Sequence, residues 1–430
     1  MGQHQRGAEA LASAAKALPD KTAKAQAQAA WRFYSNPRAT LAKLITPLQA
    51  LARDDLRQRR REFVLEVHDW CFPHYYTHTA KADQTVLSHA KDIGYELASG
   101  LLVDTVTGCP IAPIEQRLLA EGAVHSSRQP APAVDAFRLD EVLPSMQYAR
   151  SLGLGATLVH VIDQEGDSLA HLRDWDNDNH LFLVRAEGTR SVRHAGVRKS
   201  LAEVAAALKQ RGGLSWCREV LYQGNKAVQY VGEAEVVLDR PAQRHRRKGL
   251  PAGKEDRRRI PGKALRLRLV VAELRSPGGE ALAEWLLLSN LPSRVADTEV
   301  ALWYGYRSRV ESYHKLIQSA GMQLESWQQQ TAGRIARRLA VASMACALAW
   351  LAARAPGEEG QRLRSVAVRL SGRQVKAQAG WTLPALLVGM GVLTLFWRVL
   401  ADAPLLAEIL SLQQHFSPTL CTFSPAFGFV

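Results

Sequence analysis

Apolar and polar positions divide the chain into segments of different pattern. Residues 1–61 and 332–410 are rich in alanine and leucine and follow a helical pattern, with Thr40 as a candidate helix cap. Between 62 and 187, short apolar runs of strand formers alternate with helical stretches. Residues 188–297 contain strand-like runs separated by turns. The pattern predicts an α/β core interrupted by a β-rich, mostly antiparallel insertion.

These changes of pattern define five expected regions. They are a helical N-terminal region (1–61), a first part of the core (62–187), a β-rich basic insertion (188–297), a second part of the core carrying one helix (298–331) and a helical C-terminal region (332–430). The apolar stretch Thr382–Trp397 has 16 residues. A bilayer span needs about 20, so we expect a buried helix there and no membrane association.

Cysteine and histidine usage predicts no metal or disulfide framework. The five cysteines are widely spaced and form no C-x-x-C pair, which fits a reducing cytosol. Four histidines lie within a short span, at His68, His74, His78 and His89. Their spacing matches no zinc pattern, so we expect ordinary surface or core histidines.

Positive charge is concentrated in one segment of the insertion. Twelve Lys and Arg residues lie between Arg240 and Arg268, against two acidic residues. This segment therefore carries +10 of the chain's net charge of +14. Such a field favours a polyanionic partner, and we expect nucleic acid, with Arg257, Arg258 and Arg259 among the contacts. A solvated loop without a partner is the alternative.

Two aspartates end apolar runs, Asp69 after EFVLEVH and Asp163 after ATLVHVI. In α/β sheets, ligands gather beyond the carboxyl ends of the strands. Two carboxylates at that edge repel each other unless a cation lies between them. The alternative for each aspartate is that it only begins a turn.

A third carboxylate lies in a polar stripe. Tyr304, Arg307, Glu311, Lys315 and Gln318 follow one another at steps of 3, 4, 4 and 3 residues. On a single helix this spacing places them on one face, with the carboxylate flanked by cations. An ordinary surface ladder of ion pairs is the alternative.

Taken together, these blocks resemble the DDE cut-and-paste transposases of the bacterial insertion-sequence-four group. Tyr304, Arg307 and Glu311 match the family's Y-(2)-R-(3)-E-(6)-K signature, whereas Gln318 replaces its last lysine. The other matching blocks, in the family's order, are VHDW (67–70), GYELASGLLVDTVTGCPIAP (94–113), VHVIDQEGDSLAHL (159–172) and AEWLLLSNLP (283–292). Many relatives have two hydroxyl residues after the first aspartate, where this chain has tryptophan and cysteine.

The resemblance implies an RNase H-like catalytic core. In it, Asp69, Asp163 and Glu311 would bind two Mg²⁺ ions, with Mn²⁺ able to substitute. Arg307 and Lys315 would face phosphates of the DNA, and Tyr304 would donate a hydrogen bond to a backbone phosphate. The chemistry fits, because carboxylates are the hard oxygen ligands that Mg²⁺ requires and two metals can stabilise both the attacking and the leaving oxygen.

The resemblance also assigns roles within the insertion. Trp285 would stack on a base flipped out near the cut, which would allow a DNA hairpin to form. The alternative is that Trp285 is a core aromatic of a strand. Arg185, at the end of HLFLVR, is a further candidate DNA contact.

The expected function is therefore that of a DNA transposase, a nuclease and strand transferase. We expect a homodimer that joins two element ends in a synaptic complex, in the bacterial cytoplasm and associated with the nucleoid. Two alternatives remain open. One is an N-terminally shortened DNA-binding protein that dimerises with a full-length transposase and inhibits it. The other is a host RNase H-like nuclease that cleaves without strand transfer.

Overall fold

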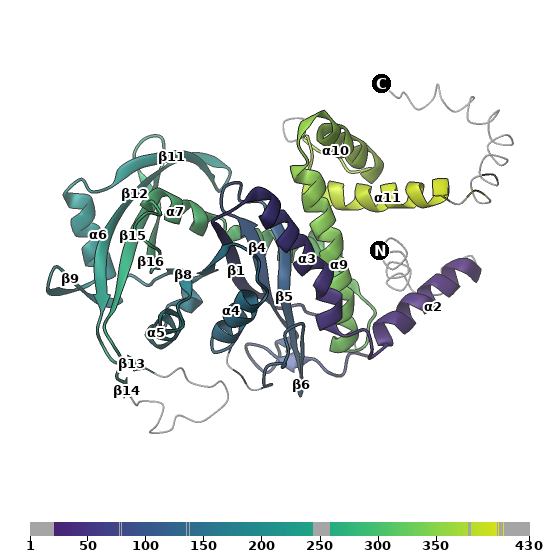
Figure 1. Ribbon diagram of the computed structural model, residues 1–430, viewed down its shortest axis with the longest axis horizontal. Helices are drawn as coiled ribbons and strands as arrows, with labels where there is room; N and C mark the ends of the chain where they lie inside the picture. The colour runs from purple at the N-terminus through teal and green to yellow at the C-terminus, as the bar shows by residue number, and fades with distance from the viewer. Residues whose placement is uncertain are drawn as a thin grey trace.

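A computed structural model describes residues 21–401, except 77, 79, 135, 137, 244–258 and 377–379, together with residues 403 and 407. The predicted α/β class is confirmed: a sheet of twelve strands forms the centre of the protein, and helices pack on its two faces (Figure 1). Its strand order is β10-β9-β12-β15-β16-β8-β7-β1-β4-β5-β6, and β11 pairs with β12.

The bounds of the elements follow. The strands of the central sheet are β1 (Phe63–Cys71), β4 (Glu96–Asp104), β5 (Pro110–Ala120), β6 (Ala123–Ser126), β7 (Thr157–Ile162), β8 (Leu181–Arg185), β9 (Ser191–His194), β10 (Val197–Ser200), β11 (Ser215–Tyr222), β12 (Asn225–Leu238), β15 (Leu265–Arg275) and β16 (Ala281–Ser289). Two small ribbons pair β2 (Thr85–Val86) with β3 (Ile93–Gly94) and β13 (Ala242–Gln243) with β14 (Arg259–Ile260). The helices are α2 (Lys21–Ser35), α3 (Leu41–Arg59), α4 (Val142–Ser151), α5 (Leu169–Asn177), α6 (Leu201–Gln210), α7 (Asp297–Gly305), α8 (Ser308–Lys315), α9 (Ala332–Arg354), α10 (Gly357–Ser371) and α11 (Leu383–Ala401).

Three parallel strands lie at the centre of the sheet. β1 pairs with β7, and β7 with β8, both in parallel. A parallel neighbour requires a crossover connection, and between β7 and β8 this connection is α5. The register of β1 against β7 ends at the pair Val67 and Val161. Side chains alternate between faces along a strand, so this register decides which residues of the two strands share a face.

The two faces of these strands bury different clusters of apolar side chains. Val67 and Val161 belong to a core that includes residues of α7, α8 and α9. Ile162, one residue further along β7, belongs to a second core with residues of α4, α5 and α6. The central strands are therefore buried on both faces, as is usual for parallel sheets.

The strands of the expected insertion are antiparallel, as their turn-separated pattern predicts. They form no separate sheet, because β16 pairs with β8 and extends the central sheet. The sequence could not show this pairing, since it joins segments about a hundred residues apart.

Helices α3 and α9 pack against each other and on β5 (Figure 1). Thr40 caps α3 as expected, with its hydroxyl oxygen accepting a hydrogen bond from the backbone N–H of Lys43 at 3.4 Å. α9 is long and apolar enough to cross a membrane, but 72% of its most apolar window is buried within the protein, as in a core helix. The predicted buried helix at Thr382–Trp397 is only partly correct. Near its start Leu386 is buried, whereas Trp397 is exposed.

A buried ion pair joins the C-terminal end of α9 to α3. A guanidinium nitrogen of Arg354 lies 2.9 Å from a carboxylate oxygen of Asp55, and both side chains are more than nine-tenths buried. We expect Arg354→Gln to lower the free energy of unfolding by about 3 kcal/mol, because it leaves a buried charge short of its partner. Urea titration followed by circular dichroism would measure the change.

A control for that change lies on α10, where Arg362 and Glu358 form a pair that is mostly exposed. Arg362→Gln should lower the free energy of unfolding by less than about 1 kcal/mol, because water screens the pair. Equal effects of the two substitutions would contradict the role given to the buried pair.

Candidate functional site

The register of β1 and β7 aligns Asp69 with Asp163. Each aspartate lies two residues beyond the last parallel pair, so both continue the face that carries Val67 and Val161. β1 does not stop at Asp69 as the sequence predicted, because pairing with β4 carries it on to Cys71. Asp163 follows β7 directly.

Each aspartate also has a local hydrogen bond. One carboxylate oxygen of Asp69 accepts from the backbone N–H of Trp70 at 2.9 Å. One oxygen of Asp163 accepts from the backbone N–H of Glu165 at 2.8 Å and so caps a short 3₁₀ turn. The turn-forming role of Asp163 is therefore present, and its second oxygen is not used in this cap.

The other two acidic residues affect the pKa of Asp69. Burial raises the pKa of Asp69 to about 6; the Trp70 N–H and the Arg307 guanidinium act to lower it, and the negative charges of Asp163 and Glu311 raise it further. The three carboxylates therefore meet in one electrostatic environment. Within the described residues, their oxygens do not form a group that lies within 4.8 Å of one another. They are thus more widely spread than the ligands of a single ion.

Arg307 lies among these acidic groups. Its guanidinium pairs with the carboxylate of Glu311. Burial alone acts to lower the pKa of Arg307, but Tyr304 and the three carboxylates outweigh burial and raise it. The pKa of Tyr304 is also raised, chiefly by burial. Arg307 is therefore held in its charged form between the acidic residues.

The single helix expected for the polar stripe is wrong. α7 ends at Gly305, α8 begins at Ser308, and a π-helical turn, Leu316–Ala320, follows Lys315. As a result Tyr304 lies on a different helix from Glu311, and Gln318 lies in the π-helical turn. The 3-4 spacing could not reveal these breaks, because none of them falls at a proline.

A cavity of about 500 Å³ adjoins this region. Four predicted site residues line it: Arg185, Trp285, Tyr304 and Arg307. Trp285 is half-buried, and its ring meets that of Tyr222 edge-on, with centroids 6.3 Å apart. Tyr222 and Arg218 also line the cavity, from β11, and the sequence did not single them out. Only the alternation along β11 could have indicated them.

Other predicted contacts lie elsewhere or cannot be placed. Lys315 is exposed at the end of α8, and Arg259 is exposed in the small ribbon of β13 and β14. Neither of them lines the cavity. Arg257 and Arg258 lie outside the described residues.

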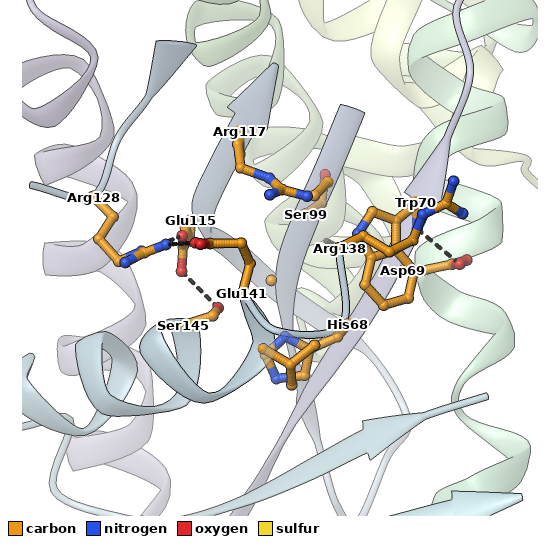
Figure 2. A pocket seen from close by; sticks show the side chains of 13 residues that line it. His68, Asp69, Trp70, Ser99, Glu115, Arg117, Arg128, Arg138, Glu141 and Ser145 are labelled. Carbon is orange, nitrogen blue, oxygen red and sulfur yellow. Dashed lines mark hydrogen bonds and ion pairs between the residues drawn. The ribbon is translucent and has the colours of Figure 1, made fainter. Parts of the chain in front are cut away.

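On the other face of β1, a smaller polar pocket borders Asp69 and Trp70 (Figure 2). Its walls hold buried ion pairs, among them Arg128 to Glu115 at 3.1 Å. Figure 2 shows the Asp69 carboxylate pointing away from these pairs. These ion pairs and a hydrogen bond from Ser145 to Glu115 join β5 to its neighbours β4 and α4 beside the candidate site.

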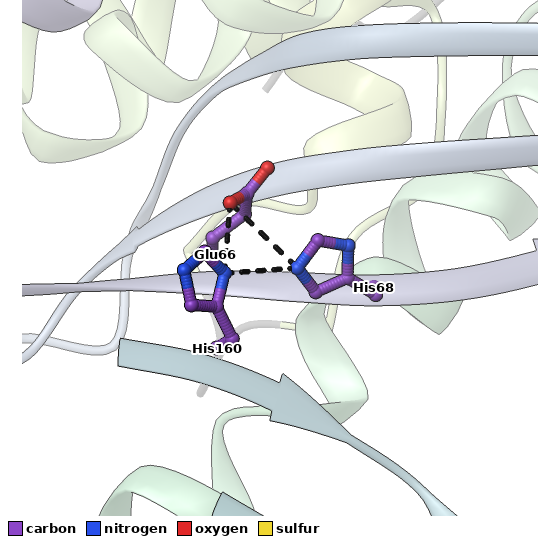
Figure 3. A group of neighbouring side chains, drawn as sticks. All are labelled: Glu66, His68 and His160. Atoms are coloured by element: carbon purple, nitrogen blue, oxygen red, sulfur yellow. Dashed lines mark hydrogen bonds and ion pairs between the residues drawn. The ribbon is translucent and has the colours of Figure 1, made fainter. Parts of the chain in front are cut away.

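A buried group of Glu66, His68 and His160 also lies on this second face (Figure 3). From the sequence, His68 was grouped only with the histidines that follow it, and no metal role was expected for any of them. In the structure two of those neighbours are engaged elsewhere, because His74 forms a hydrogen bond with Asp92 and His78 forms one with Lys81. The sequence indicates only that Glu66 and His68, two residues apart on one strand, share a face. It cannot indicate His160, which lies on β7.

Comparisons with known proteins add little. No protein family model matches the chain, and no curated protein matches it. Among solved structures, a cryo-EM structure of the piggyBac transposase synaptic complex with hairpin DNA matches with 10% sequence identity and a TM-score of 0.32. The match covers 80% of this chain and 54% of that one, so this chain spans about half the length of its neighbour. A likeness this distant supports no conclusion about function.

The raised pKa of Asp69 makes stability depend on pH. The carboxyl group titrates near 3.8 when unperturbed and near 6 in the folded protein, so the folded state holds the proton more tightly. The stability that this group contributes is present below about pH 4 and is lost as the pH rises to about 6. As the pH rises over this range, in buffer with a chelator, the free energy of unfolding should therefore fall less for Asp69→Asn than for the wild type. The difference between the two decreases should be up to about 3 kcal/mol.

Urea titrations at several pH values would test this expectation. Asp174→Asn is the matched control, because Asp174 is exposed on α5. Its profile should run parallel to that of the wild type. A parallel profile for Asp69→Asn as well would show that Asp69 is not perturbed.

Proposed function

We propose that this protein is a DNA transposase of the DDE type with an RNase H-like core, which cuts DNA at the ends of a mobile element and joins those ends to a target. The observation that carries the proposal is the register of β1 and β7. It aligns Asp69 with Asp163 at the carboxyl ends of adjacent parallel strands, where ligand groups gather in α/β sheets. The negative charge of Glu311 also raises the pKa of Asp69, so Glu311 acts on the same group of carboxylates.

The donor set fits divalent cations such as Mg²⁺, with Mn²⁺ as a substitute. Asp69, Asp163 and Glu311 offer only carboxylate oxygens, the ligands that hard cations prefer. Burial raises the pKa of Asp69, the negative charges of Asp163 and Glu311 raise it further, and bound cations would stabilise the ionised form against both effects. Their oxygens are spread more widely than the ligands of a single ion, so we assign them to two ions. Two such ions would supply activation of the attacking hydroxyl and stabilisation of the leaving oxygen.

The cationic and phenolic side chains would position the DNA. Arg307 is held charged among the carboxylates, and its planar guanidinium can exchange Glu311 for a phosphate in a two-pronged contact. Tyr304 lines the adjoining cavity and would donate to a backbone phosphate. Lys315, exposed at the end of α8, would add a point charge for a flanking phosphate.

The cavity beside the carboxylates suits a nucleotide base turned out of the duplex. Trp285 and Tyr222 offer aromatic faces, and Arg185 and Arg218 offer positive charge. Stacking on an aromatic face contributes about 1–3 kcal/mol per base, which offsets the few kcal/mol that flipping costs. Such a base would be withdrawn at the point where the strand is cut.

The remaining parts of the proposal concern assembly. The N-terminal helices and the basic segment of the insertion would hold the element ends, and the C-terminal helices would pair two subunits in a synaptic complex. Arg259 is exposed and available for DNA, and Arg257 and Arg258 precede it. A protein of this kind would work in the bacterial cytoplasm at the nucleoid.

The central test is cleavage of supercoiled donor DNA in Mg²⁺. Asp163→Asn should abolish nicking while the variant still binds DNA, because it removes a metal-binding charge and keeps the shape of the side chain. Asp174→Asn, on the surface of α5, should cleave as the wild type does. Nicking that persists in Asp163→Asn would remove Asp163 from the site.

Trp285→Ala tests the role of the cavity. It should reduce hairpin formation more than first-strand nicking, because stacking matters only once the base has been withdrawn. Trp216→Ala is the control, since Trp216 is an exposed tryptophan of β11 that does not line the cavity. If the two steps lose activity equally in Trp285→Ala, the tryptophan is a core residue and not a base platform.

A further inference from the structure

Three ligand-type side chains meet inside the protein on the face of the sheet opposite to Asp69. Glu66 and His68 lie two residues apart on β1, and His160 is the residue of β7 that pairs directly with Glu66. All three side chains are buried. Figure 3 shows the carboxylate of Glu66 and the two imidazole rings converging from the two strands.

The distances within this group match the edges of a metal coordination shell. His68 Nε2 lies 3.1 Å from His160 Nδ1 and 3.6 Å from Glu66 Oε2. The third edge, from His160 Nδ1 to Glu66 Oε2, is 3.0 Å. In a tetrahedral zinc site with bonds near 2.1 Å, neighbouring ligand atoms lie about 3.4 Å apart. The three atoms therefore already stand close to the spacing that such an ion needs.

The polar atoms of this group lack ordinary partners. Within the described residues, neither carboxylate oxygen of Glu66 accepts a hydrogen bond, and Nε2 of His160 has no hydrogen-bond partner. A carboxylate buried in this way is costly unless a positive charge or a proton satisfies it. The hydrogen bond within the group joins the two rings, and Oε2 of Glu66 has only the contacts with His160 Nδ1 at 3.0 Å and His68 Nε2 at 3.6 Å, which are ion pairs only when a ring is protonated.

The backbone leaves room for the carboxylate at this position. A Cβ atom on Gly100, in the neighbouring strand β4, would lie 2.6 Å from Oε1 of Glu66. A cavity of about 30 Å³ borders Gly100 and His68 (Figure 2). This space is large enough for one water molecule on the His68 side of the group.

We propose that Glu66, His68 and His160 bind a divalent transition-metal ion, of which Zn²⁺ is the best match. Two imidazoles and one carboxylate suit zinc, whereas Mg²⁺ prefers oxygen ligands alone. The ion would cross-link β1 to β7 on the face of the sheet opposite to the aspartates. It would thereby stabilise the register that aligns Asp69 with Asp163. This site is separate from the carboxylate site and does not depend on the function proposed for that site.

Metal binding by the purified full-length chain tests the proposal. After removal of metal with a chelator, the wild type should bind one Zn²⁺ per chain, and Co²⁺ should give the visible absorption of a four-coordinate site. His160→Gln and Glu66→Gln should each weaken zinc binding by more than the roughly 10- to 100-fold that loss of a supporting residue costs. His171→Gln removes a buried histidine of α5 and should bind zinc as the wild type does.

The His68→Cys variant tests the proposal even if the other variants fail to fold. It keeps three potential ligands and should add a thiolate-to-cobalt charge-transfer band to the Co²⁺ spectrum. Asp163→Asn should keep the zinc even if it loses DNA cleavage, so the two proposals fail separately. A wild-type chain that binds neither Zn²⁺ nor Co²⁺, or a His160→Gln chain that binds them equally well, would overturn the proposal and leave a buried cluster held by a proton.

Discussion

The parallel pairing of β1 with β7 is the constraint on which both candidate sites of this protein depend. Because side chains alternate along a strand, one register decides the composition of two faces at once. On one face it continues Val67 and Val161 into the aligned pair Asp69 and Asp163. On the other face it places Glu66 opposite His160. A shift of one residue in either strand would dismantle both arrangements together.

The two faces differ in whether a cationic side chain lies beside the carboxylates. The aspartates lie at the edge of the sheet, where Arg307 shares their environment and one of its cationic nitrogens pairs with Glu311. On the opposite face, burial dominates. It raises the pKa of Glu66 to about 7 and lowers the pKa of His68 to about 4, with the neighbouring charges acting after it. Burial therefore disfavours the charged forms of Glu66 and His68, and also that of Asp69 at the edge, whereas Arg307 stays charged because the acidic residues outweigh its burial.

The extension of the sheet builds the cavity. β16 joins β8 edge to edge and carries Trp285, while β11 adds Arg218 and Tyr222 from the other side of β12. α7 and the turn before α8 close the cavity with Tyr304 and Arg307. Arg185 of β8 lines the cavity as well, so residues from four separate parts of the chain surround one space beside the aspartates.

The sequence by itself determined the elements and the chemical type of the candidate site. Apolar runs marked β1, β4, β7 and β8. Asp69 and Asp163 could be found because a polar residue that ends an apolar run, as in β1 and β7, breaks a local pattern. The helix cap at Thr40 was equally local. Only the tertiary structure decided which residues meet. It broke the expected single helix after Gly305, merged the insertion with the central sheet, and brought His160 to Glu66 across about ninety residues of chain. Strand pairing and burial act between segments that are distant in sequence, so no local pattern of residues could specify these encounters.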